Sequence, residues 1–145
     1  MKDKIIFGPA GKPLDYNGSA YTSSKYLSKQ GLHAFEYQSS HGIRIGEKSA
    51  KILKKQSEKE DVLISMHGPY YINMCSKEPE KIDASIERLV DSARVGEWMG
   101  AYRLVFHPGF YSNQKPEKAL KICEQSYKRL LERCEEEGFE NYTFA

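Results

Sequence analysis

Two apolar runs in this chain each end in a histidine that is followed by a Pro/Gly turn. The first run extends from Val62 to Met66 and leads into His67, and the second extends from Leu104 to Phe106 and leads into His107. Short runs rich in β-branched and aromatic residues are typical of strands buried in a parallel sheet. Because sites in parallel α/β folds lie at the carboxyl ends of the strands, we expect both histidines to face one site.

Apolar runs and amphipathic stretches alternate along the whole sequence. We expect strands at Lys4–Phe7, Leu32–Tyr37, Val62–Met66, Leu104–Phe106 and Tyr142–Ala145, and helices at Asn17–Gln30, Gly46–Lys59, Glu80–Gly96 and Pro116–Gly138. This order predicts a parallel sheet with right-handed helical crossovers. Both an open doubly wound sheet and a (β/α)8 barrel are built in this way.

The chain is long enough for a complete open doubly wound sheet of five strands, so its length alone does not select the barrel. Its 145 residues are a little over half of the roughly 250 residues of a typical barrel. An apolar run at the very end, with no helix after it to cover it, also suits an interrupted barrel. We therefore predict an α/β fold of parallel (β/α) units of the TIM-barrel type, holding the first four to five strands of a (β/α)8 barrel, with residues 1–145 as a single partial barrel domain.

Composition excludes several other classes of protein. The 22 basic and 20 acidic residues give a formal charge of +2, which is too balanced to indicate nucleic-acid binding from overall charge. No apolar stretch approaches the roughly 20 residues of a membrane-spanning helix, and the amino terminus lacks the apolar core of a signal peptide. We therefore expect a cytoplasmic protein with no membrane contact. The three cysteines form no CxxC pair, which argues against a disulfide framework or a thiolate zinc site.

The two strand-end histidines allow two interpretations. Each imidazole either caps a loop carbonyl, or both point into a shared pocket at metal-ligand range. Two ligands do not complete a zinc site, which needs three or four. Tyr70 and Asn73 follow His67 in the same loop, where a phenol and a carboxamide are able to hydrogen-bond a sugar or a phosphate.

Three further polar residues lie near the second predicted strand. Arg44 follows the loop after this strand and suits an anionic ligand, whereas His41 lies within the loop, where isolated histidines are mostly solvated. Glu36 is the only carboxylate on a predicted strand. It either faces the interior of the sheet or pairs with a cation on a helix.

The segments His67-Gly-Pro-Tyr-Tyr-Ile-Asn73 and Phe106-His107-Pro-Gly109 resemble the first two metal-binding segments of the endonuclease IV family, the zinc-dependent apurinic/apyrimidinic endonucleases with a xylose-isomerase-like barrel. The opening Phe7-Gly-Pro-Ala-Gly-Lys-Pro13 resembles the start of archaeal members. The resemblance implies the N-terminal half of a barrel, zinc as cofactor, and cleavage of DNA 5′ to an abasic site. It also implies that His67 and His107 are ligands to one zinc and that Tyr70 lies against the abasic nucleotide.

The chain departs from the family pattern after its last predicted strand. The family's bridging glutamate and its later aspartate, histidine and glutamate ligands have no counterpart here, so the catalytic residues stay unassigned. A partial barrel leaves strand edges open, which predicts self-association or pairing with a missing C-terminal half. Two alternatives remain: a metal-dependent sugar isomerase or epimerase of the xylose-isomerase type, whose site includes Glu36 and His67, and a non-catalytic half-barrel that dimerises.

Overall fold

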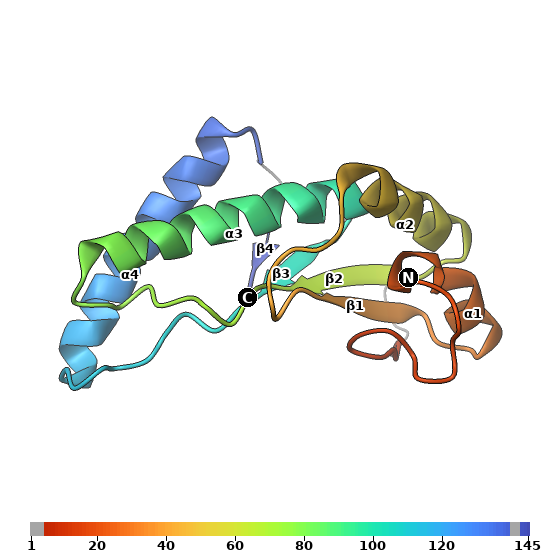
Figure 1. The fold of residues 1–145 in the computed structure, drawn as a ribbon, viewed down its shortest axis with the longest axis horizontal. Helices are drawn as coiled ribbons and strands as arrows, with labels where there is room; N and C mark the ends of the chain where they lie inside the picture. Colours follow the sequence, from red (N-terminus) through yellow and green to blue (C-terminus); the bar gives the residue numbers. More distant parts are fainter. Residues whose placement is uncertain (1–4, 140–142) are drawn as a thin grey trace.

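A computed structural model describes residues 5–139 and 143–145 and shows strands and helices in alternation (Figure 1). The elements, in chain order, are η1 Ala20–Thr22, α1 Ser24–Lys29, β1 Ala34–Gln38, α2 Glu47–Lys59, β2 Leu63–His67, α3 Pro79–Met99, β3 Arg103–Val105, α4 Pro116–Glu136 and β4 Thr143–Phe144. The strands form one sheet in the order β1-β2-β3-β4, and each neighbouring pair is parallel. The predicted α/β fold of parallel (β/α) units is therefore confirmed.

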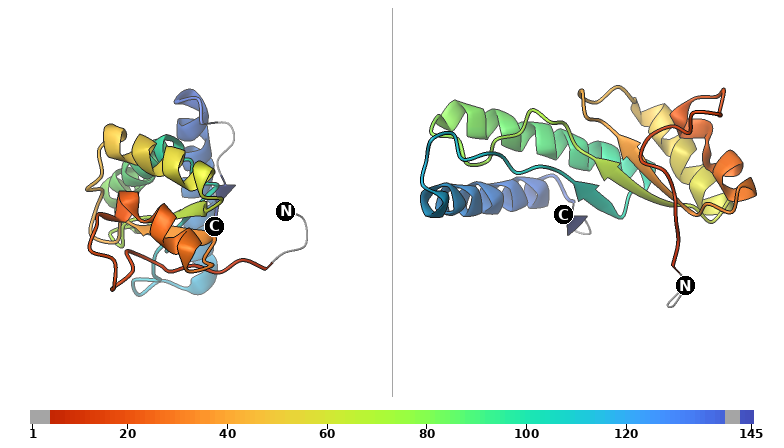
Figure 2. Two further views of the ribbon diagram at one scale, coloured as in Figure 1. Left: turned by 90° about the vertical axis from the view of Figure 1, so that its right-hand side faces the viewer. Right: turned by 90° about the horizontal axis from the view of Figure 1, so that it is seen from below.

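Helices α2 and α3 pack on one face of this sheet (Figures 1 and 2). Side chains alternate between the faces of a strand, and the register places Phe35 beside Ile64 and Met66 beside Leu104 on the helix-covered face. All four are buried. The opposite face, which would point into a closed barrel, carries Glu36, Gln38, Leu63, Ser65, Arg103 and Val105, all of which are exposed or half-buried.

Helix α3 is longer than the sequence predicts. The helix expected over Glu80–Gly96 extends to Met99 and ends at Gly100, whose φ of 68° lies in the left-handed region. Gly100 thus supplies the usual glycine cap, while Gly96 is buried inside the helix. The predicted helix ended one turn too early because Gly96 was interpreted as its end.

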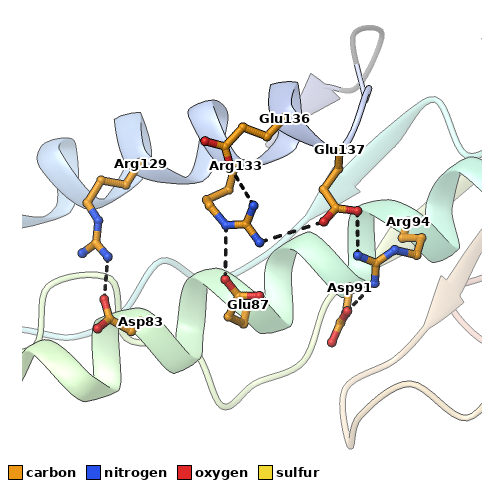
Figure 3. Close-up of polar contacts among 8 residues, drawn as sticks. All are labelled: Asp83, Glu87, Asp91, Arg94, Arg129, Arg133, Glu136 and Glu137. Atoms are coloured by element: carbon orange, nitrogen blue, oxygen red, sulfur yellow. Dashed lines mark hydrogen bonds and ion pairs between the residues drawn. The ribbon is translucent and has the colours of Figure 1, made fainter.

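Helix α4 lies alongside α3, and ion pairs join the two helices (Figure 3). Arg129 Nη2 lies 2.5 Å from Asp83 Oδ1, and Arg133 Nε lies 3.4 Å from Glu87 Oε1. At the far end Arg94 of α3 donates to Glu137 at a distance of 2.9 Å. Each pair is partly or largely solvent-exposed and contributes little to stability by itself, but together they join the two helices.

The amino-terminal segment runs alongside β1 but does not form the regular strand that was predicted over Lys4–Phe7. Residues 5–9 have no regular secondary structure, and Lys4 lies outside the described residues. The carbonyl of Phe7 accepts hydrogen bonds from His33 and Ala34, and Gly11 donates to Glu36 at 2.9 Å. Pro9 has no N–H to donate, so a continuous ladder is impossible here. The only bridge joins Ala10 to Glu36, in parallel orientation, within the part of the chain that is described.

The predicted helix over Asn17–Gln30 is also shorter in the structure. It is divided into the 3-10 turn η1 and the six-residue helix α1. The hydroxyls of Thr22 and Ser23 donate to the backbone carbonyls of Ser19 and Ala20, and such local bonds compete with helix formation. At the other end of the chain, β4 confirms the last predicted strand, apart from Tyr142, which lies outside the described residues. No helix in the described part of the chain is long and apolar enough to cross a membrane.

Candidate functional site

The structure brings His67, Tyr70 and His107 together at the carboxyl ends of β2 and β3. The two imidazole ring centroids are 5.3 Å apart. The Tyr70 ring lies 5.5 Å from that of His67 and 5.7 Å from that of His107. The expectation that neighbouring strand ends converge is thus met in the geometry, and we refer to these three residues as the ring cluster.

The hydrogen bond of His67 determines which of its nitrogens is free. Nδ1 lies 2.8 Å from the carbonyl oxygen of Gly68. Because a carbonyl only accepts, Nδ1 carries the hydrogen, and in the neutral ring Nε2 keeps its lone pair. An Nδ1–H bonded to a backbone carbonyl is a usual support for a metal-binding histidine. His67 is buried and His107 is exposed, so the pair has one fixed and one solvent-facing imidazole.

The spacing of the two histidines fits two positions around one zinc ion. Imidazoles that bind a tetrahedral zinc through nitrogens roughly 2.0–2.1 Å from the metal have ring centroids about 5 Å apart, close to the 5.3 Å seen here. Within residues 5–139 and 143–145, however, no group of three or more His, Cys, Asp or Glu side chains is placed to hold a metal ion. The described residues therefore fit part of a zinc site.

Asn73 is held by its own loop. Its backbone N–H donates to Ser85 Oγ at 2.9 Å, and its Oδ1 lies 3.3 Å from both the backbone N and the Sγ of Cys75. The backbone of Gly109 passes so close that an added Cβ would lie 2.5 Å from this Oδ1. Asn73 thus connects the loop after β2 to the loop after β3, and its predicted contact with substrate stays a prediction.

Further hydrogen bonds fasten these two loops together. Met74 N–H donates to Pro108 O at 2.7 Å, and the side chain of Gln114 donates to Cys75 O at 2.7 Å. Gly109 has a φ of 144°, a backbone conformation that residues with a Cβ rarely adopt. The loops that carry His67 and His107 are therefore mutually braced, which keeps the ring cluster in place.

The loop after β1 also reaches the site, through His41. Its ring centroid lies 6.4 Å from that of Tyr70, edge to face, and Tyr70 N–H donates to Ser40 O at 3.1 Å. Sequence reasoning undervalued His41 because it treated the residue as an isolated loop histidine. The available signal was its place after a parallel strand, the same place that drew attention to His67 and His107.

Arg44 and Glu36 are placed less directly. Arg44 is exposed, and no contact found among the described residues joins it to the ring cluster; its binding role stays a prediction. Glu36 faces the open side of the sheet beside Ser65, and its Oε1 accepts a hydrogen bond from Gln38 at 2.7 Å. Of the two arrangements considered for Glu36, the structure shows the one in which its side chain lies on the face that would point into a closed barrel.

Comparison with known proteins places the chain in a family. Residues 25–142 match the family model described as xylose isomerase-like TIM barrel. The chain belongs to the xylose isomerase-like TIM barrel family. The crystal structure of D-psicose 3-epimerase from Clostridium cellulolyticum H10 superimposes with a TM-score of 0.68 at 11% identity, over 82% of this chain and 44% of that one. The barrel type of the fold is thus confirmed.

Two relatives define the resemblance more closely. An uncharacterized protein from Methanocaldococcus jannaschii is 34% identical over 131 residues, which are 90% of this chain and 46% of that protein. A probable endonuclease 4 from Mycoplasma mobile is 27% identical over 134 residues, which are 90% of this chain and 43% of that protein. The chain thus spans less than half the length of these relatives, and the resemblance to the endonuclease IV family is confirmed.

Proposed function

We propose that this chain carries the first two zinc ligands of a DNA-repair endonuclease that cleaves the backbone 5′ to abasic sites. The observation that supports the proposal most directly is the pair of imidazoles at adjacent strand ends, 5.3 Å apart, with the Tyr70 ring against both. The relatives named probable endonuclease 4 support the same chemistry. Those relatives extend well beyond the matched region, and we propose that the remaining ligands belong to a region of the kind that the match does not cover.

Each residue of the ring cluster has a separate task in this proposal. His67 offers Nε2 because its Nδ1 is occupied by Gly68 O, and His107 offers a nitrogen from the solvent side. A zinc ion bound there supplies Lewis-acid stabilisation of the charge that develops on a phosphate. Tyr70, 53% exposed, presents its ring and hydroxyl to the sugar next to that phosphate. Arg44 and Asn73 are proposed as further DNA contacts, and the protein is proposed to act in the cytoplasm.

Zinc titration and an incision assay test the proposal together. We expect the chain to bind zinc, and His67→Ala and His107→Ala each to weaken binding more than about tenfold. His33→Ala is the matched control. His33 lies just before β1, at the end of the sheet away from the ring cluster, where its Nδ1 is 2.8 Å from the Asp61 carbonyl oxygen. Once the remaining ligands are supplied, a labelled duplex with a tetrahydrofuran abasic-site analogue should be cut 5′ to the analogue. Folded chain that does not bind zinc through the two histidines would contradict the proposal.

A sugar epimerase is the second candidate. It is favoured by the superposition on D-psicose 3-epimerase and by Glu36, a carboxylate on the open side of the sheet, where a proton-transfer group would be needed. Incubation with D-psicose and a divalent cation should then yield the C3 epimer, and Glu36→Gln should abolish the product. Absence of any epimer leaves the endonuclease as the better account.

A non-catalytic half-barrel that dimerises is the third reading, and it predicts association through the open strand edges. Sedimentation over a range of concentrations measures this directly. A monomer at all concentrations contradicts the dimerising form, whereas a dimer with neither metal nor either activity contradicts both enzymatic proposals.

A further inference from the structure

A hollow of about 510 Å³ lies between α1 and α2, at the end of the sheet opposite the ring cluster. Helix α1 leads into β1 and α2 leads into β2, so the last turns of both helices lie where these strands begin (Figure 1). His67, in contrast, lies at the carboxyl end of β2. The hollow is lined by lysines, tyrosines and three other polar residues: Tyr16, Thr22, Lys25, Tyr26, Lys29, Gln56, Lys59 and Glu60. We call it the lysine hollow.

The three lysines around this hollow have no acidic partner. Lys25, Lys29 and Lys59 are exposed, and none of them forms an ion pair within residues 5–139 and 143–145. The helix dipole accounts for a lysine in the last turn of a helix, but Lys25 lies in the first turn of α1, where the dipole disfavours a cation. Cations that converge on a cleft repel one another and raise the local concentration of anions. The lysine hollow is therefore suited to a ligand with more than one negative charge, such as a phosphate monoester.

Two acceptors beside the lysines suit the hydroxyl groups of such a ligand. The side-chain oxygen of Gln56 is buried and has no hydrogen-bond partner among the described residues, which is a costly state for an amide oxygen. Because no such bond holds the carboxamide, it can turn toward a donor that enters the hollow. Glu60 adds a half-buried carboxylate. A ligand with both a phosphate and hydroxyl groups meets the lysines and these acceptors, whereas inorganic phosphate uses mainly the lysines.

The tyrosine side of the hollow is formed before any ligand binds. The Tyr16 and Tyr26 ring centroids are 5.2 Å apart, and the Tyr16 hydroxyl donates to Thr22 O at 2.8 Å. The Tyr16 ring also packs so closely on Gly18 that an added Cβ there would clash with it. Lys12 Nζ donates to Tyr16 O at 3.0 Å. A ligand that enters thus loses little free energy to ordering this wall, which favours binding.

We propose that the lysine hollow binds a phosphorylated sugar, with the phosphate held by the three lysines and the sugar hydroxyls held by Gln56 and Glu60. Ligand sites commonly combine aromatic walls with a few placed polar groups, and here the two tyrosines form the wall. The site is independent of the proposed reaction, because it lies at the other end of the sheet from the ring cluster. The sugar phosphate bound there is therefore a second ligand and not the substrate of the two histidines.

Isothermal titration calorimetry of the unaltered chain with ribose 5-phosphate tests this site. A metal chelator in the buffer prevents the phosphate from binding through a metal at the histidines. Lys29→Ala and Lys59→Ala should each weaken binding about tenfold, through loss of a hydrogen bond to a charged group. Lys48→Ala is the matched control, because Lys48 is also an exposed lysine of α2 but does not line the hollow.

Gln56→Met separates recognition of the sugar from recognition of the phosphate. It removes the unpartnered amide at little change in size, so the fold should be retained, and circular dichroism of each variant verifies this. We expect Gln56→Met to weaken binding of ribose 5-phosphate about fivefold and to leave binding of inorganic phosphate unchanged. His67→Ala should leave the binding of both ligands unchanged.

The possible outcomes separate this site from the proposed function. Folded chain with no affinity for ribose 5-phosphate overturns the site, even if zinc binding at the ring cluster is found. Equal losses in Lys29→Ala and Lys48→Ala also overturn it, because they would show a diffuse cationic surface. A loss in His67→Ala would place the ligand at the ring cluster, and tighter binding of a 5′-phosphorylated oligonucleotide would contradict a small ligand. Losses confined to the lining lysines and Gln56→Met support the site, even if the chain binds no zinc and incises no DNA.

Discussion

The two faces of the parallel sheet differ in what covers them. On the face under α2 and α3, Ile64, Met66 and Leu104 are at most 2% exposed. On the face that points away from these helices, Leu63 is 38% exposed and is accompanied by polar neighbours such as Glu36 and Ser65. The covered face holds a packed core, and the open face has the composition of a barrel interior that meets solvent.

This contrast separates the part of the molecule that packs a core from the part that presents polar groups at the candidate site. The covered face is completed by helices of this chain, so it should supply nearly all of the stability. The open face and the ring cluster at its edge contain polar groups suited to ligands, and a full set of metal ligands is not present among the described residues. Stability and the candidate site thus depend on different faces of the sheet.

A pair of identical substitutions tests the contrast most strongly. Leu104→Ala on the covered face removes a fully buried side chain and should lower the free energy of unfolding by about 2–5 kcal/mol. Leu63→Ala, on the neighbouring strand but the open face, should cost about 1 kcal/mol or less, because much of that side chain is already in water. Urea unfolding measures both. Equal losses would mean that the open face is covered in solution, by self-association or another contact.

Gly109→Ala should have the next largest effect, and it acts on the site side of the molecule. The φ of 144° disfavours any residue with a Cβ, and the new atom would lie 2.5 Å from Asn73 Oδ1. We expect a cost of about 1–3 kcal/mol and weaker zinc binding, because the loop carrying His107 must move. Gly42→Ala is the control: its φ of 98° is also left-handed, but an added Cβ there meets open space. Loss of stability with unchanged zinc binding would show that the loop brace does not position the histidines.

The covered face was largely predictable from sequence, and the reason is periodicity. The positions Ile82, Ile86, Leu89, Val90 and Ala93 repeat at helical spacing and are all buried in α3. Errors occurred where periodicity gives no guidance. Gly96 resembled a helix end but packs inside α3, and in α4 the apolar side chains of Leu120 and Leu131 are 60% and 44% exposed. A pattern shows which residues are apolar, but it does not show whether a partner is present to cover them.

The site was predictable only in part, for a different physical reason. His67 and His107 could be predicted to lie together because strand ends converge whatever the details of the loops. Asn73 and His41 depend on loop hydrogen bonds between segments far apart in sequence, such as that from Tyr70 N to Ser40 O. Contacts of this kind become visible only once the loops are placed in three dimensions.

The smallest predicted effect concerns Glu137, whose ion pair with Arg94 helps to join α3 and α4. Two influences oppose each other there: Glu137 lies at the carboxyl end of α4, where the helix dipole disfavours a carboxylate, but the hydrogen bond from Arg94 favours the charged form. The pKa of Glu137 is lowered, chiefly by that bond, so the arginine prevails. A lowered folded-state pKa means that the pair stabilises the fold above the unfolded pKa of about 4.3 and that this contribution is lost as the pH falls through the folded value.

Glu137→Gln should therefore lower the Tm slightly at neutral pH, and the difference from the unaltered chain should shrink below about pH 4.3 and then vanish. Thermal unfolding across this pH range measures it, with Glu135→Gln as the control, since no ion pair of Glu135 is found in the described part of the chain. A Tm difference that persists at pH values where the carboxyl of Glu137 is protonated would mean that the substitution acts through packing or the helix dipole. The ion pair of Glu137 would then not stabilise the fold through its charge. The packing of α4 on α3 would depend on buried apolar side chains such as Leu130.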